Sequence, residues 1–262
     1  MQVLERGGTK LAYADSGGRG HPVVLIHGWC CDRSFFQPQF DHLVGLGHRV
    51  VALDLRGHGE SDAPHGAYSM EVFTDDVAWC LRELALERPV VVGHSMGGII
   101  AFNLAARYPD LTGAIVMIDS AVFRSAGALK AIGGICERLA GPDRVAVARE
   151  YVSSALFIAT DDPVRKSDIL RRMGNAPAHV MLGAMEGLRD YDPSSARGRI
   201  AVPSLFIMAD EPVPRSYMPG LLELVPQLMV GQTVGSGHFC QLEVPDQVNA
   251  MLDRFISIAG RN

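Results

Sequence analysis

Short apolar runs bounded by glycine, proline or aspartate recur along the chain. Each run is rich in valine, isoleucine and leucine and is too short for a helix, which is typical of a strand buried on both faces. We expect five such strands, at residues 22–28, 50–53, 89–92, 114–120 and 203–210. Two shorter extended segments, near residues 1–5 and 11–14, precede them.

Helical periodicity occupies the intervals between most of these strands. Apolar residues spaced three to five apart predict a helix over residues 70–86, and a second helix follows residues 93–98 and ends near Pro109. The tail after Pro245 is amphipathic, with four apolar residues on one face: Val248, Met251, Leu252 and Phe255. Strands that alternate with helices predict an α/β fold, with a mostly parallel, doubly wound central sheet covered on both sides.

This alternation breaks between residues 121 and 200. The stretch of about eighty residues carries helical patterns and no convincing strand, and it is too long for a simple loop between neighbouring strands. We therefore expect a helical cap at residues 121–200, inserted before the penultimate strands. Residues 1–120 and 201–262 would form the core.

The composition excludes several classes of function. Of 262 residues, 48% are hydrophobic and 20% charged, and the net charge of −5 gives no basic footprint for nucleic acid or an anionic membrane. Five cysteines without a C-x-x-C spacing favour reduced thiols over a disulfide framework or a zinc site. We expect a cytoplasmic protein, because the N-terminus lacks an apolar signal sequence and no apolar run is long enough to span a bilayer.

The segment GHSMG, residues 93–97, has the form Gly-x-Ser-x-Gly and joins an apolar strand to an apolar helix. Small neighbours let the backbone fold sharply there, and the turn lifts a serine above the edge of the sheet. It also directs backbone N–H groups at the start of the helix toward developing negative charge. We therefore expect Ser95 to be a nucleophile; the alternative is a glycine-lined turn with an incidental serine.

A serine nucleophile needs a base, and His238 is the best placed of nine histidines. It lies in GSGHFCQ, a loop between the last strand and the C-terminal helix, from which its ring can fold over the sheet edge. We expect His94 to point away from Ser95, and His27 and His58 to be structural. The other five histidines are expected at the surface: His21, His42, His48, His65 and His179.

The segment HGWC, residues 27–30, follows the first long strand, so its loop can lie beside the turn that carries Ser95. The backbone N–H groups of Trp29 and Met96 are then the candidate oxyanion hole, which binds the negative oxygen of a tetrahedral intermediate. The Trp29 side chain is also suited to a pocket wall. The adjacent Cys30 and Cys31 are interpreted as small buried apolar residues.

Four segments together resemble the α/β-hydrolase fold family: HGW at 27–29, DLRGHGES at 54–61, GHSMGG at 93–98 and GSGHFCQLEVPDQV at 235–248. They occur in the order of that family and leave only the expected cap unmatched. The resemblance implies a Ser–acid–His triad that hydrolyses a carboxylic ester or lactone of a small to medium apolar substrate through an acyl-enzyme. A serine at position 95 argues against a dehalogenase or an epoxide hydrolase, which usually carry aspartate there.

The acid of this triad is open between two places that the family uses. Asp119 ends the fourth strand, whereas Glu211 follows the fifth strand immediately before a proline, and Asp210 is a third candidate. An acid after the fifth strand is more usual in the family, but the loop here is shorter than the usual pattern. Whichever residue serves would hold the tautomer of His238 and stabilise its charged form.

The segments HGWCCDRSFF and GHFCQLEVPD also resemble the cofactor-independent dioxygenases of the same fold. Those enzymes keep an acid after the fourth strand and use the histidine to deprotonate an organic substrate for reaction with oxygen. A C–C bond hydrolase and a ligand receptor with little turnover are further alternatives on this fold. We expect a small-molecule substrate, no nucleic-acid or membrane partner, no cofactor and no metal; a homodimer is compatible with the sequence.

Overall fold

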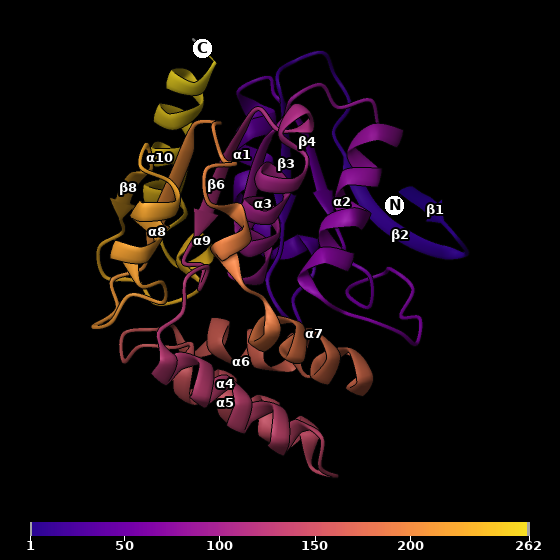
Figure 1. The fold of residues 1–262 in the computed structure, drawn as a ribbon, viewed down its shortest axis with the longest axis vertical. Coiled ribbons are helices and arrows are strands. Elements are labelled where there is room, and N and C mark those ends of the chain that lie inside the picture. Colours follow the sequence, from indigo (N-terminus) through magenta and orange to yellow (C-terminus); the bar gives the residue numbers. More distant parts are fainter. Residues whose placement is uncertain (1, 261–262) are drawn as a thin grey trace.

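The centre of the structure, a computed structural model that describes residues 2–260, is an eight-stranded sheet in the order β1-β2-β4-β3-β5-β6-β7-β8 (Figure 1). The strands are β1 (Gln2–Arg6), β2 (Thr9–Asp15), β3 (Pro22–Ile26), β4 (Arg49–Leu53), β5 (Val90–His94), β6 (Ala114–Ile118), β7 (Ser204–Met208) and β8 (Met229–Gln232). The first two strands pair antiparallel, and every pairing from β4 to β8 is parallel. The carboxyl ends of six strands therefore meet at one edge, where α/β proteins bind their ligands.

The core has two layers because successive side chains of a strand point to opposite faces of the sheet. In β3, Val23 and Leu25 belong to one layer, and Val24 and Ile26 belong to the other. All four residues are buried, so the strand reads as a continuous apolar run instead of an alternating one.

Helices pack on both faces of this sheet. Apolar residues of α1 (Gln37–Gly45) and α10 (Pro245–Ala259) join the layer on one face. The layer on the other face contains apolar residues of α2 (Met70–Glu83), α3 (Met96–Arg107) and α8 (Met218–Leu224). Three short elements complete the core: η1 (Arg33–Phe36), η2 (Pro109–Leu111) and α9 (Cys240–Glu243).

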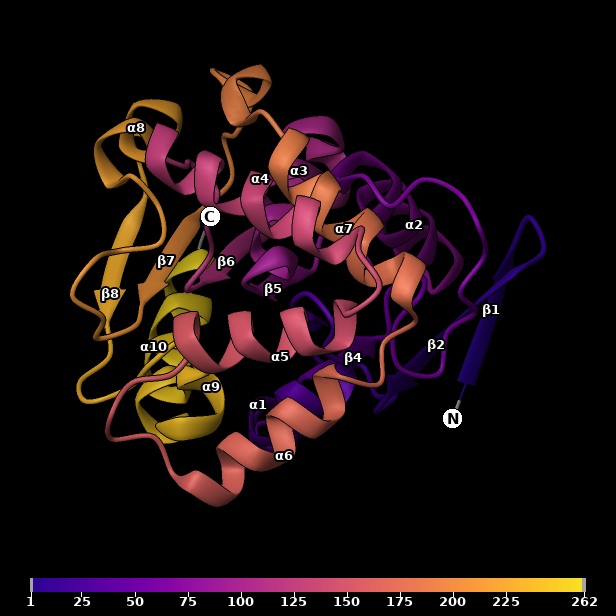
Figure 2. The same cartoon turned by 90° about the horizontal axis from the view of Figure 1, so that it is seen from below.

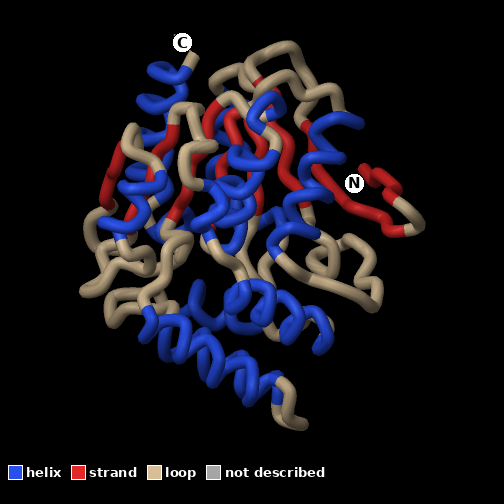
Figure 3. The backbone as a smooth tube through the Cα atoms, in the orientation of Figure 1, coloured by secondary structure: helices blue, strands red, loops and turns tan. Residues whose placement is uncertain are grey.

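Between β6 and β7 the chain forms a helical insertion, residues 121–200. The structure describes every residue of this insertion, and none of them belongs to a strand. Its elements are α4 (Ala126–Leu139), α5 (Arg144–Ala155), α6 (Pro163–Met173), α7 (Ala178–Asp190) and η3 (Pro193–Ala196). Figure 1 shows its four α-helices gathered at one end of the molecule, and in Figure 2, seen from below, they lie in front of the sheet. Figure 3 shows the same separation between these helices, in blue, and the strands of the sheet, in red.

Polar contacts join the helical insertion to loops at the carboxyl edge of the sheet. Trp29 Nε1 donates a hydrogen bond to the Met181 carbonyl at 2.9 Å, and Arg172 pairs with Asp32 at 2.9 Å. A contact between Arg215 Nη2 and the Ala155 carbonyl at 2.8 Å reaches the segment after β7. The insertion is thus attached to the segments that carry the candidate site residues.

The elements expected from the sequence agree with the structure except at one edge. The five apolar runs correspond to β3–β7, and the two opening segments correspond to β1 and β2, although Met1 and the last two residues of the expected core, 261–262, lie outside the described residues. None of the expected strands corresponds to β8, which alternates between exposed and half-buried positions and lacks an apolar run. Within residues 2–260, no helix is both long and apolar enough to cross a membrane.

Candidate active site

Ser95 occupies a strained turn between β5 and α3. Its backbone angles, φ 55° and ψ −118°, define a conformation that residues other than glycine rarely adopt. The Ser95 N–H donates to the Ile118 carbonyl at 2.9 Å, and the Ser95 carbonyl accepts a hydrogen bond from Ser120 Oγ at 2.8 Å. The end of β6 therefore holds this turn from both sides.

Glycines beside Ser95 are required because main-chain segments approach closely there. A Cβ at Gly93 would lie 2.1 Å from the Gly97 carbonyl oxygen, and a Cβ at Gly97 would lie 2.1 Å from the Ile26 carbonyl oxygen. Without side chains at these positions, α3 begins directly against the end of β3. This close approach brings the loop that follows β3 next to Ser95.

That loop carries one of the two candidate oxyanion donors. Gly28 is so near the turn that a Cβ on it would lie 3.1 Å from Ser95 Cβ, and the next residue is Trp29. Among residues 2–260, no protein group accepts a hydrogen bond from the Trp29 N–H. Met96 is the first residue of α3, where an N–H has no acceptor within the helix. Both N–H groups are therefore available to a ligand.

His27 fixes the same loop to the end of β4. Its Nδ1 lies 2.8 Å from the Gly28 carbonyl oxygen, and its Nε2 accepts the Leu55 N–H at 3.1 Å, which places the ring proton on Nδ1. Burial lowers the pKa of His27 to about 4 and that of His58 to about 3, so both rings are neutral near pH 7. Both are buried structural histidines, as expected, and the five histidines expected at the surface are exposed or half-buried.

His238, in the loop between β8 and α9, forms a hydrogen bond with Asp119 at the end of β6. The distance between His238 Nδ1 and Asp119 Oδ2 is 2.6 Å, and both side chains are buried. Asp119 has a φ of 43°, and its Oδ1 also accepts the Ala209 N–H at 3.3 Å. Ser95 and His238 line one cavity, although within residues 2–260 no hydrogen bond joins the serine hydroxyl to the imidazole. Such bonds often tighten only when substrate is bound.

The other two acid candidates, Glu211 and Asp210, have different partners. Glu211 Oε1 accepts a hydrogen bond from Arg215 Nη2 at 2.6 Å, and Asp210 Oδ2 accepts the Gly235 N–H at 2.9 Å. The same arginine donates from its Nε to Asp119 Oδ2 at 2.8 Å. Glu211 thus balances the charge of an arginine that contacts Asp119, and it does not contact His238.

These neighbours keep the imidazole of His238 neutral. Burial and the nearby charge of Arg215 lower the pKa of His238 to about 4, despite the opposing hydrogen bond and charge of Asp119. Burial alone would raise the pKa of Asp119, but the hydrogen bond from His238 and the charges of His238 and Arg215 outweigh it and lower that pKa. Near pH 7, Nδ1–H therefore donates to an ionised carboxylate and Nε2 can accept a proton.

His94 was expected to point away from Ser95, but it lies beside His238 and lines the same cavity as Ser95. The two ring centroids are 4.6 Å apart, and His94 Nε2 lies 2.8 Å from the His238 carbonyl oxygen, to which it donates. Burial and the proximity of His238 hold the pKa of His94 well below its usual value. His94 is therefore a neutral residue that positions the backbone of His238.

Ser95 and His238 open into a cavity of about 70 Å³ between the sheet edge and the helical insertion. Eight of its lining residues come from the insertion: Ala121, Arg124, Ile132, Tyr151, Leu156, Met173, Met185 and Leu188. Pockets for drug-sized ligands usually measure about 300–1,000 Å³. A mainly apolar cavity of this smaller size suits a small molecule.

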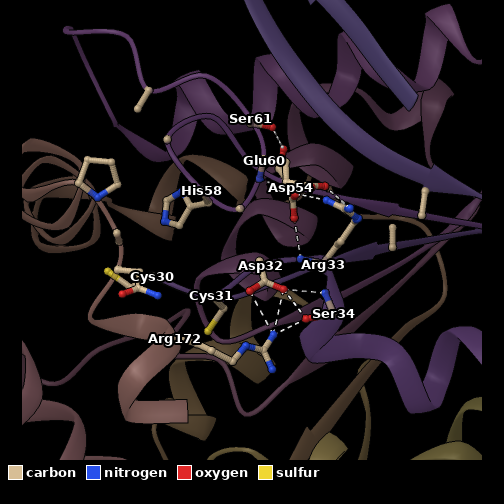
Figure 4. Close-up of a pocket in the computed structure, with 18 of the residues that line it drawn as sticks. Cys30, Cys31, Asp32, Arg33, Ser34, Asp54, His58, Glu60, Ser61 and Arg172 are labelled. Carbon is tan, nitrogen blue, oxygen red and sulfur yellow. Dashed lines mark hydrogen bonds and ion pairs between the residues drawn. The ribbon is translucent and has the colours of Figure 1, made fainter. Parts of the chain in front are cut away.

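A separate cleft of about 600 Å³ lies on the outer side of the loop after β3 (Figure 4). Neither Ser95 nor His238 lines it, and its charged side chains pair with one another: Arg33 with Asp54 and Glu60, and Arg172 with Asp32. Cys31 lines both the cleft and the cavity, but burial raises the pKa of its thiol, which favours the un-ionised form. We therefore assign the candidate active site to the smaller cavity.

All five cysteines are free and buried, in agreement with the interpretation of Cys30 and Cys31 as small apolar residues. Among residues 2–260, no group of three or more His, Cys, Asp or Glu side chains is arranged to hold a metal ion.

The close contact at Gly97 leads to a stability prediction. Gly97→Ala should lower the free energy of unfolding by about 2–4 kcal/mol, because the new Cβ forces main-chain segments apart. Gly133→Ala is the matched control: it lies within α4, no atom is within 4 Å of the added Cβ, and alanine should raise stability by about 0.5–1 kcal/mol. Urea denaturation followed by circular dichroism measures both changes, and equal effects would contradict the role given to Gly97.

The charge of Arg215 leads to a second prediction. Arg215→Gln should raise the pKa of His238 by about one to two pH units, because a cation that disfavours the imidazolium is removed and Asp119 becomes more basic. Titration of the ¹⁵N-labelled imidazole by NMR measures this pKa directly. Arg138→Gln removes an exposed cation of α4 and should leave the pKa unchanged. A pKa of His238 that stays near 4 in Arg215→Gln would refute this account of its environment.

Known proteins share the sequence and fold of this chain. A family model described as the α/β hydrolase fold matches residues 21–245. The chain is 27% identical over 259 residues to the AB hydrolase superfamily protein YisY of Bacillus subtilis (strain 168), which covers 93% of this chain and 94% of that protein.

Two solved structures superpose over nearly the whole chain. A thermophilic esterase from Thermogutta terrifontis has a TM-score of 0.87 at 25% identity, over 99% of both chains. The enol-lactonase from Burkholderia xenovorans LB400 has a TM-score of 0.86 at 24% identity, over 98% of this chain and 100% of that one, which establishes a common fold. Because the family model matches most of its length, the chain belongs to the α/β-hydrolase fold family.

Proposed function

We propose that this protein is a serine hydrolase that cleaves a carboxylic ester or a lactone through an acyl-enzyme. The observation that carries the proposal is the 2.6 Å contact between His238 Nδ1 and Asp119 Oδ2, in a cavity that a serine on a strained turn also lines. Membership of the α/β-hydrolase family and the similarity to the thermophilic esterase support it.

In the proposed reaction, His238 Nε2 takes the proton of the Ser95 hydroxyl while Oγ attacks the carbonyl carbon of the substrate. The carbonyl oxygen becomes negative and accepts hydrogen bonds from the N–H groups of Trp29 and Met96. The tetrahedral intermediate then expels the alcohol, which takes its proton from His238, and an ester on Ser95 remains. A water molecule deprotonated by His238 releases the acid and restores the serine.

Asp119 is the proposed acid of the triad. Its carboxylate holds the Nδ1–H tautomer of His238 and stabilises the imidazolium that forms during each step. Arg215, in the segment after β7, is a residue that positions Asp119, because it donates to the same carboxylate oxygen that contacts His238. Glu211, the other main candidate, takes the role of a counter-charge for Arg215.

We also propose that the helical insertion, residues 121–200, is a cap that selects the substrate. It provides apolar side chains to a cavity whose catalytic side comes from the core. Exclusion of water by such a cap strengthens the hydrogen bonds that stabilise the oxyanion, because the local dielectric constant falls.

A second candidate, cofactor-independent dioxygenation, is favoured by one observation: the acid bonded to His238 follows β6, as it does in the dioxygenases that the sequence resembles. In that reaction His238 deprotonates the organic substrate and Ser95 is not a nucleophile. The two functions therefore differ in their dependence on Ser95.

Replacement of the nucleophile separates these two functions. Ser95→Ala should reduce kcat/KM for acetate and butanoate esters by about 10³–10⁶-fold, because no acyl-enzyme can form. Initial rates and mass-spectrometric detection of the acyl-enzyme in the wild type measure this effect. Unchanged ester turnover in Ser95→Ala would exclude the hydrolase mechanism, and oxygen uptake with hydroxylated heteroaromatics that requires His238 but not Ser95 would favour dioxygenation.

A parallel series of amides identifies the acid. Asp119→Asn should lower kcat by about 10²–10⁴-fold, because an amide NH₂ no longer holds the required tautomer. Glu211→Gln should lower it less than about tenfold, and Asp210→Asn should have little effect, since neither carboxylate contacts His238. Circular dichroism verifies that each variant is folded. A larger loss in Glu211→Gln than in Asp119→Asn would assign the acid to Glu211.

A further inference from the structure

Arg124 is a buried cation in the cavity that contains Ser95. It lies in the loop between β6 and α4, its side chain lines the cavity, and the residue is only 7% exposed. One nitrogen, Nη2, donates a hydrogen bond to the Tyr191 carbonyl oxygen. Within residues 2–260, Nε and Nη1 are buried and have no hydrogen-bond partner.

The cost of this burial is not offset by an opposite charge. A buried cation normally pairs with a carboxylate, because removal of a charge from water without compensation is strongly unfavourable. Among residues 2–260, no carboxylate lies within ion-pair distance of Arg124, and Asp192 acts only through its more distant charge. Burial lowers the pKa of Arg124, with smaller opposing effects from Tyr191 and Asp192.

The other arginine of the cavity provides an internal comparison. Arg215 contacts Asp119, Glu211 and the Ala155 carbonyl. Although burial opposes it, the two carboxylates raise the pKa of Arg215, so its charge is balanced by the protein. Arg124 shares the same cavity and lacks such partners, which leaves its N–H donors for a molecule that enters the cavity.

A molecule bound at Ser95 is within reach of Arg124. Ser120 Oγ donates to the Ser95 carbonyl at 2.8 Å, and Ala121, the next residue, lines the same cavity. Ala121 and Arg124 both line the cavity, so the segment that follows β6 forms part of its wall. The surrounding wall is apolar, with Ile99 from α3 and Leu188 from α7, so Arg124 contributes an isolated positive charge.

We propose that the substrate carries a carboxylate group and that Arg124 binds it. The substrate class is then a short-chain ester or lactone of mainly apolar character with one carboxylate. A single carboxylate matches one unpaired guanidinium, whereas a phosphate monoester brings about two charges. The catalytic part of this inference rests on the proposed hydrolase function, but the binding of a carboxylate does not.

Arg124 also has a purely structural role that must be separated from this one. Tyr191, whose carbonyl it contacts, is the C-cap residue directly after α7, and a cation near a helix C-terminus is stabilising. If this were its whole role, its removal would weaken all substrates alike.

The binding experiment uses the Ser95→Ala protein, which cannot turn over an ester by the proposed mechanism. Butanoate and butanamide have nearly the same shape and differ in charge, and NMR titration measures their dissociation constants. We expect butanoate to bind at least tenfold more tightly than butanamide, and Arg124→Met in the same background to abolish that preference. Arg138→Met is the matched control, because it removes an exposed cation of α4 and should retain the preference.

The kinetic experiment compares monomethyl succinate with methyl butanoate in proteins with an intact Ser95. Arg124→Met should lower kcat/KM for the charged ester by about 10–100-fold, mainly through KM, and leave the neutral ester within about threefold. Arg124→Lys should retain part of the preference. Equal losses for both esters, or equal binding of butanoate and butanamide to Ser95→Ala, would overturn the inference. Retained turnover in Ser95→Ala would instead refute the hydrolase proposal and leave the binding result intact.

Discussion

A single oxygen atom, Asp119 Oδ2, accepts hydrogen bonds from two side chains on separate loops. His238 Nδ1 lies 2.6 Å from it and Arg215 Nε lies 2.8 Å from it, which a carboxylate oxygen with two lone pairs can accommodate. The segments after β6, β7 and β8 therefore meet at one atom. The orientation of the imidazole in the cavity depends on this contact, since His238 is otherwise carried by a loop.

The charges around that atom also suit a base that is protonated only briefly. With both carboxylates ionised, Asp119, Glu211 and Arg215 carry one net negative charge beside a neutral imidazole. Protonation of His238 makes the cluster neutral. Without Glu211, the single carboxylate of Asp119 would have to balance two cations, the imidazolium and Arg215. The low pKa of His238 keeps Nε2 unprotonated over a wide pH range, and Asp119 provides the stabilisation when the proton arrives.

The cavity places two arginines in different electrostatic situations. Arg215 is neutralised by carboxylates of the core, whereas Arg124, at the start of the helical insertion, contacts the carbonyl and the ring of Tyr191 and, among residues 2–260, forms no ion pair. Electrostatic interactions are strong in such a small apolar space, because little water screens them. An unbalanced cation there discriminates between ligands by charge, whereas the apolar wall supplied by the insertion discriminates by size.

Several features of the protein were determined by local sequence. Buried parallel strands appear as apolar runs, and the glycines around Ser95 mark a turn that only small residues permit, so the strands from β3 to β7 and the turn were predicted correctly. The edge strand β8 was not assigned, because a partly exposed strand has no apolar run to reveal it. The contact of His94 with His238 was not predicted, because it joins the end of β5 to a loop that is far away in the sequence.

Only the tertiary structure decided which carboxylate contacts the histidine. Asp119, Glu211 and Asp210 each follow a strand at the same sheet edge, and their local sequence left the choice between them open. In the fold, Asp119 contacts His238, Glu211 pairs with Arg215, and Asp210 accepts the Gly235 N–H. Likewise, the sequence showed Arg124 as one basic residue among many, and its burial without a carboxylate is a property of the packed fold alone. The local sequence therefore determined which turns and strand ends hold the candidate catalytic residues. Contacts between distant loops determined which charged groups surround each of those residues.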